Sequence, residues 1–134
     1  MVVKFSIPIE PIPQPRARVT RNGTYQPAKI RAYKAIIKKA ALAAMNGNPP
    51  LTGEIHCSIR LYRKYKSTSR RFGDCDNLYK AITDAMNEAV YLDDSQITRC
   101  TVEKITAPYP HVEITIDSEF DKAATFKNTA QNAV

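Results

Sequence analysis

The sequence predicts an α+β fold, in which two main helices pack on a small mixed β-sheet. Two stretches, residues 2–9 and 54–62, alternate apolar and polar residues with the period of two that is typical of strands, and two later stretches also read as strands. Two longer stretches place apolar residues at the spacing of an amphipathic helix. The elements follow the order strand, loop, helix, strand, helix, strand, strand, which favours a mixed sheet with helices packed against it.

The N-terminal part is expected to hold one strand and then a proline-rich basic segment. The strand is predicted over residues 2–9. The prolines at positions 8, 11, 13 and 15 then favour an extended segment and exclude a central strand. Asn22-Gly23 is a strong tight-turn signal, so residues 18–25 are expected to form a short hairpin or a mobile basic loop.

The first helix is expected from Pro27 to about Met45, because proline is favoured in the first helical turn and Gly47 is a stop signal. A second strand is predicted over residues 54–62, and a basic loop over residues 63–73. The predicted core face of the first helix comprises Ile30, Tyr33, Ile37, Ala40, Ala41 and Leu42, with Lys29, Lys34, Lys38 and Lys39 on its other side.

The second helix is predicted over residues 75–90. Residues 97–106 and 111–116 then read as a closing pair of strands around Pro108 and Pro110. Together these elements make one domain over residues 1–117, followed by a polar tail over 118–134 that is expected to be flexible. The predicted core face of the second helix comprises Leu78, Ala81, Ile82, Ala85, Met86 and Ala89.

Composition argues against a membrane-spanning, disulfide-rich or zinc-binding protein. No stretch approaches the roughly 18 to 20 apolar residues that a membrane span needs, and the first residues lack the apolar core of a signal peptide, so a cytoplasmic location is expected. The three cysteines, Cys57, Cys75 and Cys100, are widely spaced. They form neither a disulfide framework nor a CxxC motif, so small thiols without a zinc site are expected.

Charge is distributed unevenly along the chain. The formal net charge is +7. Residues 1–73 contain 15 Lys and Arg against two acids, whereas residues 74–134 contain five against 11. A strongly basic half favours a polyanionic partner such as nucleic acid, and the plain alternative is a solvated, charge-rich surface.

Acidic residues gather within this basic surrounding. Asp74 and Asp76 stand at the start of the second helix, Lys80 follows one turn later, and Asp93 and Asp94 lie just beyond it. Clustered carboxylates repel one another unless a cation binds between them, and oxygen ligands suit magnesium. The structural alternative is a helix cap at Asp74, an ion pair between Asp76 and Lys80, and a turn at residues 93–94.

The segments that carry these acids, Asp74-Cys75-Asp76-Asn77-Leu78-Tyr79-Lys80-Ala81 with Asp84-Ala85, and Leu92-Asp93-Asp94-Ser95-Gln96-Ile97, resemble the RusA family of Holliday junction resolvases. The likeness covers roughly residues 3–117, including the basic N-terminal region. It implies a magnesium-dependent homodimer that nicks four-way DNA junctions symmetrically, with manganese as a substitute metal. By this resemblance the catalytic residues are Asp74, Asp76, Lys80 and Asp94, and the metal ligands are Asp74, Asp76 and Asp94, with Asp93 as an open alternative.

Basic residues outside the acidic segment are the expected DNA contacts. Phosphate contacts of this kind make affinity fall steeply with salt. A two-fold dimer would offer matched active sites to a junction that is itself roughly two-fold symmetric. The predicted DNA-binding residues are Arg16, Arg18, Arg21, Lys64, Lys66, Arg70 and Arg71, and Tyr65 is a candidate for stacking.

Three other functions stay open at this stage. The same site could serve a nuclease of broader specificity that cuts flaps or other branched DNA. A non-catalytic DNA-binding protein is disfavoured, because a protein that only binds DNA has no use for carboxylates near the phosphates. An RNA-binding basic domain is also disfavoured, because no RRM or KH signature is present.

Overall fold

A computed structural model describes residues 1–15, 18–21 and 23–119 of the chain. The predicted DNA contact Arg16 and nearly all of the predicted tail 118–134 lie outside these described residues. For Arg18 the structure describes the backbone, in a strand, and not the side chain.

A four-stranded sheet forms the centre of the fold. Its strands are β1 (Val2–Ile7), β4 (Ile55–Arg63), β5 (Ile97–Thr106) and β6 (His111–Asp117), in the order β1-β6-β4-β5. Strand β6 pairs antiparallel with both β1 and β4, and β4 pairs parallel with β5. The sheet is therefore mixed, and the predicted α+β class is confirmed.

The prediction that residues 97–106 and 111–116 form a closing pair is wrong in one respect. Both are strands, but β4 lies between them in the sheet. Helix α2 (Cys75–Met86) carries the chain from β4 back to the parallel neighbour β5, which leaves β5 at the edge. Strand β6 alternates buried and half-buried residues and takes the interior position, because a sheet interior suits a strand with a continuous apolar face.

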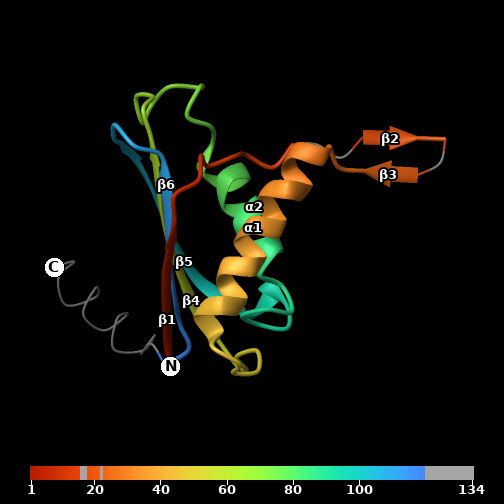
Figure 1. Ribbon diagram of the computed structural model, residues 1–134, viewed down its shortest axis with the longest axis vertical. Helices are drawn as coiled ribbons and strands as arrows, with labels where there is room; N and C mark the ends of the chain where they lie inside the picture. Colours follow the sequence, from red (N-terminus) through yellow and green to blue (C-terminus); the bar gives the residue numbers. More distant parts are fainter. Residues whose placement is uncertain (16–17, 22, 120–134) are drawn as a thin grey trace, which may run out of the picture.

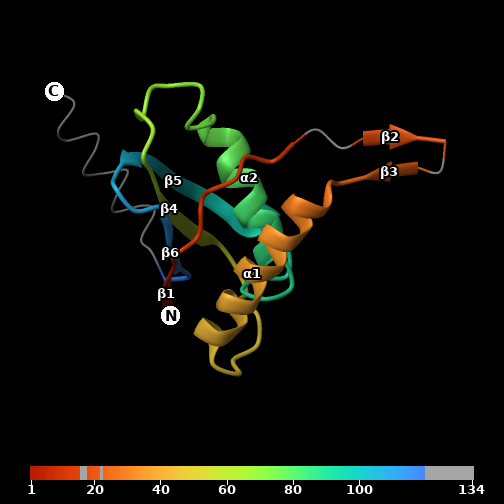
Figure 2. The same cartoon turned by 45° about the horizontal axis from the view of Figure 1, so that its top comes forward.

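Helices α1 (Ala28–Met45) and α2 lie side by side on one face of the sheet (Figures 1 and 2). The predicted core face of α2 is buried in full, including Ala89, which lies just past the helix end. On α1 the prediction holds except at Leu42, whose side chain is 51% exposed. Met45, which was not predicted, completes the apolar stripe instead, since it continues the four-residue spacing from Ile37 through Ala41.

Two short elements complete the fold. Strands β2 (Arg18–Thr20) and β3 (Gly23–Tyr25) pair as the hairpin that was one of two predicted alternatives. The hairpin projects beyond the start of α1, away from the sheet (Figures 1 and 2). A 3-10 helix, η1 (Asp94–Gln96), lies between α2 and β5 and was not predicted.

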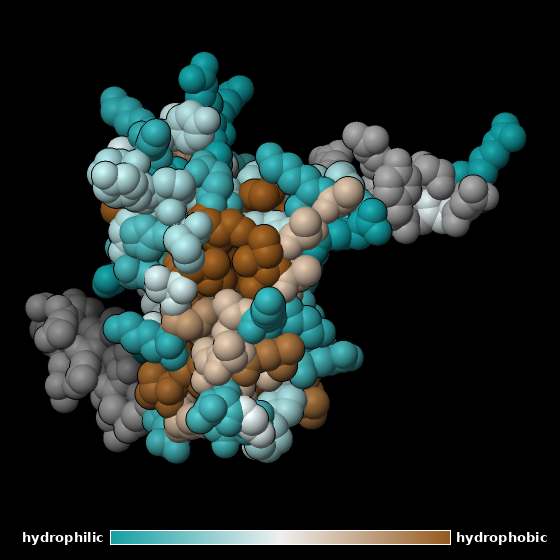
Figure 3. Space-filling model, viewed as in Figure 1, coloured by the Kyte–Doolittle hydropathy of each residue, from teal (hydrophilic) through white to brown (hydrophobic). Residues whose placement is uncertain are grey.

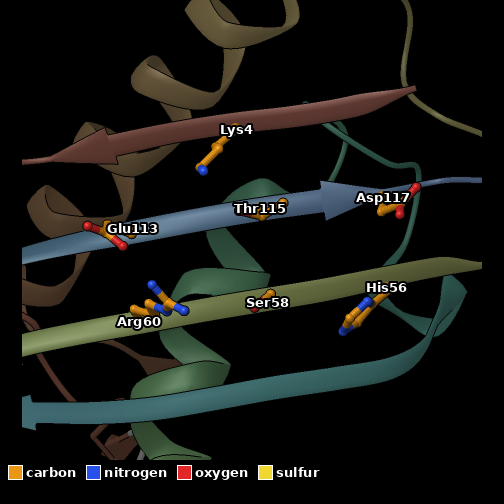
Figure 4. A pocket seen from close by; sticks show the side chains of 7 residues that line it. All are labelled: Lys4, His56, Ser58, Arg60, Glu113, Thr115 and Asp117. Atoms are coloured by element: carbon orange, nitrogen blue, oxygen red, sulfur yellow. The ribbon is translucent and has the colours of Figure 1, made fainter. Parts of the chain in front are cut away.

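The face of the sheet opposite the helices is polar and carries a shallow hollow (Figure 4). Its lining combines bases and acids from β1, β4 and β6, and several residues on this face already pair with one another. Arg60 Nε lies 3.4 Å from Glu103 Oε1, and the rings of Tyr62 and His111 stack with centroids 3.7 Å apart. The lining residues are Lys4, His56, Ser58, Arg60, Glu113, Thr115 and Asp117.

Two further sequence predictions concern the cysteines and membrane spans. Cys57 is buried in the sheet, whereas Cys75 and Cys100 are exposed, and all three are free thiols. Within the described ranges, no helix is long and apolar enough to cross a membrane.

Candidate active site

A hollow of about 360 Å³ on the exposed side of α2 brings the acidic residues together. Asp76, Lys80 and Asp84 contribute to it at intervals of four residues, so they project from the same side of the helix. Asp94 enters from η1, which lies against α2. The complete lining is Asp76, Tyr79, Lys80, Thr83, Asp84 and Asp94.

The start of α2 is fixed from both sides by backbone contacts. Gly73 has a φ of +101°, a conformation that favours glycine, and a β-carbon there would meet Leu78 at 3.4 Å. Lys104 Nζ donates to the carbonyl of Gly73 at 2.9 Å. The backbone N–H of Gln14, in the proline-rich segment, donates to the carbonyl of Asn77 at 2.9 Å. These contacts hold the turn that presents Asp76.

A capping box fixes the two neighbouring aspartates in different roles. The Asp93 carboxylate accepts from the backbone N–H of Ser95 at 3.0 Å, and Gln96 Oε1 accepts from the backbone N–H of Asp93 at 3.1 Å. Gln96 Nε2 also donates to the carbonyl of Leu51 at 3.0 Å, which ties η1 to the body. Asp93 therefore caps η1, and Asp94 is the member of the pair that lines the hollow.

The electrostatics of the two side chains differ accordingly. Partial burial raises the pKa of Asp94, and the hydrogen bond and the charge of Asp84 raise it further, while a hydrogen bond with Asn87 opposes them. The hydrogen bond from Ser95 lowers the pKa of Asp93. The Asp94 carboxyl group is thus the one that lies in an acidic, partly desolvated surrounding.

Asp84 also lines the hollow, although the sequence predicted no role for it beyond its place in the motif. Lys34 Nζ of α1 lies 3.6 Å from Asp84 Oδ2, and both side chains are largely covered. Tyr91 Oη donates to the carbonyl of Thr83 at 2.6 Å and fixes this turn of α2 from the interior. The signal was present in the sequence, because Asp84 continues the four-residue interval that joins Asp76 and Lys80.

Asp74 is placed differently from the other predicted acids. Its backbone occupies the N-cap position of α2, but its exposed carboxylate accepts no hydrogen bond from the helix. It does not line the hollow. Of the described residues, no three His, Cys, Asp or Glu side chains converge closely enough to hold an ion as they stand.

Exposed bases lie on the segment that leads into α2. Lys64, Lys66, Arg70 and Arg71 are all exposed on the loop between β4 and α2, and Arg21 is exposed at the hairpin turn. In Figure 3, hydrophilic side chains cover the loop region at the top of the molecule and the far end of the hairpin. The predicted DNA contacts among the described side chains therefore lie on two segments that extend from the body.

Arg63 belongs to the structure of this loop and not to its free surface. Its guanidinium donates to Glu10 Oε1 at 2.6 Å and to the carbonyl of Phe72 at 2.8 Å. It also lies over the ring of Tyr65, 4.8 Å from the centroid. Arg63 therefore fastens the two ends of the basic loop to the N-terminal segment.

Comparison with known proteins decides the family. Residues 8–117 match the family described as Endodeoxyribonuclease RusA. This chain belongs to the RusA endodeoxyribonuclease family. It is also 31% identical, over 85% of its length and 94% of the relative's, to the protein of Bacillus subtilis (strain 168) described as "Uncharacterized protein YqaN".

Membership of the RusA family gives the hollow its chemical context. The matched range includes all of α2 and η1, and so it includes every residue that lines the hollow. A RusA-family nuclease acts on a phosphodiester bond. The helix that carries Asp76, Lys80 and Asp84 starts directly after the basic loop, which is where a DNA backbone bound by that loop would arrive.

Proposed function

We propose that this protein is a magnesium-dependent endonuclease that resolves four-way DNA junctions by paired, symmetric nicks in recombination and repair. The observation that carries the proposal is the hollow in which Asp76, Lys80, Asp84 and Asp94 meet. An acidic hollow beside exposed bases suits a nuclease, because the bases bind phosphates while the acids serve the chemistry. Junction preference rests on the family, whose members include Holliday junction resolvases.

The residues of the hollow fit a magnesium ion by their donor chemistry. Asp84 and Asp94 line the same hollow, and partial burial and then the neighbouring Asp84 carboxyl group raise the pKa of Asp94, so the two carboxylates repel each other when both are ionised. A hard cation between these oxygen donors would relieve that repulsion. Magnesium commonly uses one or two carboxylates and keeps water and phosphate oxygens as its other ligands, so a set of three converging residues is not required.

In the proposed reaction, water attacks the phosphorus atom and one P–O bond of the DNA backbone breaks. Asp94 and Asp76, with Asp84, would hold the metal, which would lower the pKa of the attacking water and stabilise the leaving oxygen. Lys80 would stabilise the negative charge that develops on the phosphate oxygens. Asp74 stays in the proposed catalytic set, because its carboxylate lies at the start of the same helix and is not used as a helix cap.

Binding would use the two basic segments and a second copy of the chain. Lys64, Lys66, Arg70 and Arg71 of the loop and Arg21 of the hairpin are exposed and able to contact phosphates. Arg16 and Arg18 belong to the same proposed surface. A homodimer would supply two equivalent sites to a two-fold substrate. Sedimentation equilibrium at micromolar protein without DNA tests this part, and a monomer mass would refute it.

The deciding experiment compares strand nicking of a labelled mobile four-way junction, a flap and a plain duplex, with magnesium and with manganese. Asp76→Asn keeps the shape of the side chain and removes its charge, so it is expected to bind the junction without cutting it. Glu103→Gln is the matched control, because Glu103 is an exposed acid. Its partner, Arg60, lies on the face of the sheet that is turned away from the helices. This variant is expected to cut normally.

Each result assigns a different activity. Paired nicks in the junction alone support resolution. Equal cutting of the flap and the junction would replace it with a branched-DNA nuclease of broader specificity. Junction binding without any cutting, in either metal, would leave only a DNA-binding protein.

A further inference from the structure

Lys34 differs from the other lysines of α1. Lys29, Lys38 and Lys39 are exposed, whereas the Lys34 side chain is only 18% exposed. Covering a lysine costs solvation of its ammonium group and rotamer freedom of a long side chain. A lysine held in this way is expected to have specific partners that compensate for both costs.

The partners of Lys34 come from two different parts of the molecule. Its ammonium group donates to Gln26 Oε1 at 3.1 Å, and Gln26 follows directly after strand β3 of the basic hairpin. The same ammonium group lies 3.6 Å from Asp84 Oδ2 of α2. One lysine therefore links the base of the hairpin to the wall of the acidic hollow.

Asp84 connects Lys34 to the proposed metal site. Its carboxyl group is in contact with Lys34 and lines the same hollow as Asp94. A positive charge at Lys34 also reduces the repulsion between the two carboxylates, which would otherwise favour their separation.

We propose that Lys34 is a positioning residue of the nuclease site: it fixes the Asp84 carboxylate beside Asp94 and ties both to the base of the DNA-binding hairpin. The inference rests on the function proposed above. It assigns Lys34 no contact with DNA or with the reacting atoms. The effect of Lys34 is therefore expected in the catalytic rate and in metal binding, and not in junction affinity.

The test compares Lys34→Met, Lys34→Arg and Lys38→Met. Methionine keeps the length of the side chain without its charge, arginine restores the charge, and Lys38 is an exposed lysine one turn further along the same helix. The measurements are the single-turnover nicking rate against magnesium concentration, junction affinity in calcium, and manganese binding by calorimetry without DNA.

Loss of positioning in Lys34→Met is expected to lower the maximal nicking rate by roughly 10-fold to 100-fold. Junction affinity should stay unchanged. Removing a positive charge makes the hollow more negative, so manganese should bind at least about twofold more tightly and half-maximal nicking should need less magnesium. Lys34→Arg should regain most of the rate, and Lys38→Met should match the native protein.

Two results would overturn the proposal. One is a Lys34→Met protein with the native rate and native metal binding. The other is a slower protein that melts at a lower temperature and binds manganese more weakly, which would make Lys34 a general structural residue. If the native protein binds manganese but cuts nothing, the proposed function fails. The inference then stands or falls on whether Lys34→Met tightens manganese binding.

Discussion

Asp84 and Asp94 line the same hollow and the charge of Asp84 raises the pKa of Asp94, although one residue belongs to α2 and the other to η1. They lie ten positions apart along the chain, and the turn between them is closed by a hydrogen bond from the backbone N–H of Glu88 to the carbonyl of Tyr91 at 2.7 Å. Two acids held together in this way are a source of instability that the fold tolerates. Such a feature is typical of a functional site.

Asp94→Asn is therefore expected to stabilise the protein while it removes nuclease activity. The folded protein raises the pKa of Asp94, chiefly by partial burial and then by its neighbour Asp84, so the ionised form is disfavoured in the folded state. This penalty is absent below the unfolded pKa of about 3.9 and is complete above the folded pKa. In EDTA at pH 7, urea unfolding should show a gain of no more than about 1 kcal/mol, because solvent screens the charge.

The same measurement at pH 3.5 provides the control for that prediction. Both states of the native protein are then largely protonated at Asp94, so the difference between native and Asp94→Asn proteins should shrink. A variant that is less stable than the native protein at pH 7 would contradict the prediction.

Substitutions at Asp93 should have the opposite consequences. Asp93→Ala removes the acceptor for the Ser95 N–H and should lower the free energy of unfolding. Asp93→Asn keeps a capping oxygen and should change stability little. Nicking by Asp93→Asn is expected to stay near the native rate, unlike that of Asp94→Asn. Equal loss of nicking in both variants would assign Asp93 to the metal site as well.

The sequence predicted the features of the fold that depend on neighbouring residues, and it missed those that depend on contacts between distant segments. Periodicity is a local property, so it located both helices, the strands and most of the buried face of each helix. The position of β4 between β5 and β6 depends on pairing between distant segments, which no local pattern encodes. Leu42 was assigned to the core for a related reason, because a broad apolar stripe leaves its edge residue undecided until the neighbouring element is known.

The same difference between local spacing and distant contacts applies to the candidate site. The spacing along α2 predicted that Asp76 and Lys80 share a face. The choice between Asp93 and Asp94 could not be made, because it depends on the capping box at η1 and on the contact of Gln96 with Leu51, 45 residues away. The contact of Asp84 with Lys34 joins two helices and could not be predicted from local spacing either.

The exposed bases of the loop should govern the salt dependence of DNA binding. Each phosphate contact that is lost should reduce the slope of log affinity against log salt by roughly 0.9. Lys64→Ser combined with Lys66→Ser should lower this slope on junction DNA. The control is Lys38→Ser combined with Lys39→Ser, which removes the same charge from an exposed part of α1. If both double variants change the slope equally, the loop is not a specific binding surface.

Arg63 should contribute to stability far more than its exposed neighbours. Arg63→Met leaves Glu10 and the carbonyl of Phe72 without their donor and should cost about 2 kcal/mol in the free energy of unfolding. Arg60→Met is the matched control, because the ion pair of Arg60 with Glu103 is exposed to solvent and its loss should cost much less. Urea denaturation of the two variants measures the difference. Equal costs would show that the Arg63 contacts are not needed to hold the loop.

His56, on the open face of the sheet, should make the protein less stable in mild acid. Partial burial lowers the pKa of His56, the charge of Arg99 lowers it further, and Asp117 opposes them. The folded state therefore binds the proton less readily than the unfolded state, so stability falls as pH drops below about 6.5 and the loss is complete below the folded pKa. His56→Gln should lose less stability between pH 8 and pH 5 than the native protein does, by under about 1 kcal/mol because the site is partly solvated. Urea unfolding at both pH values gives this difference directly, and an identical pH dependence in the two proteins would exclude His56 as its source.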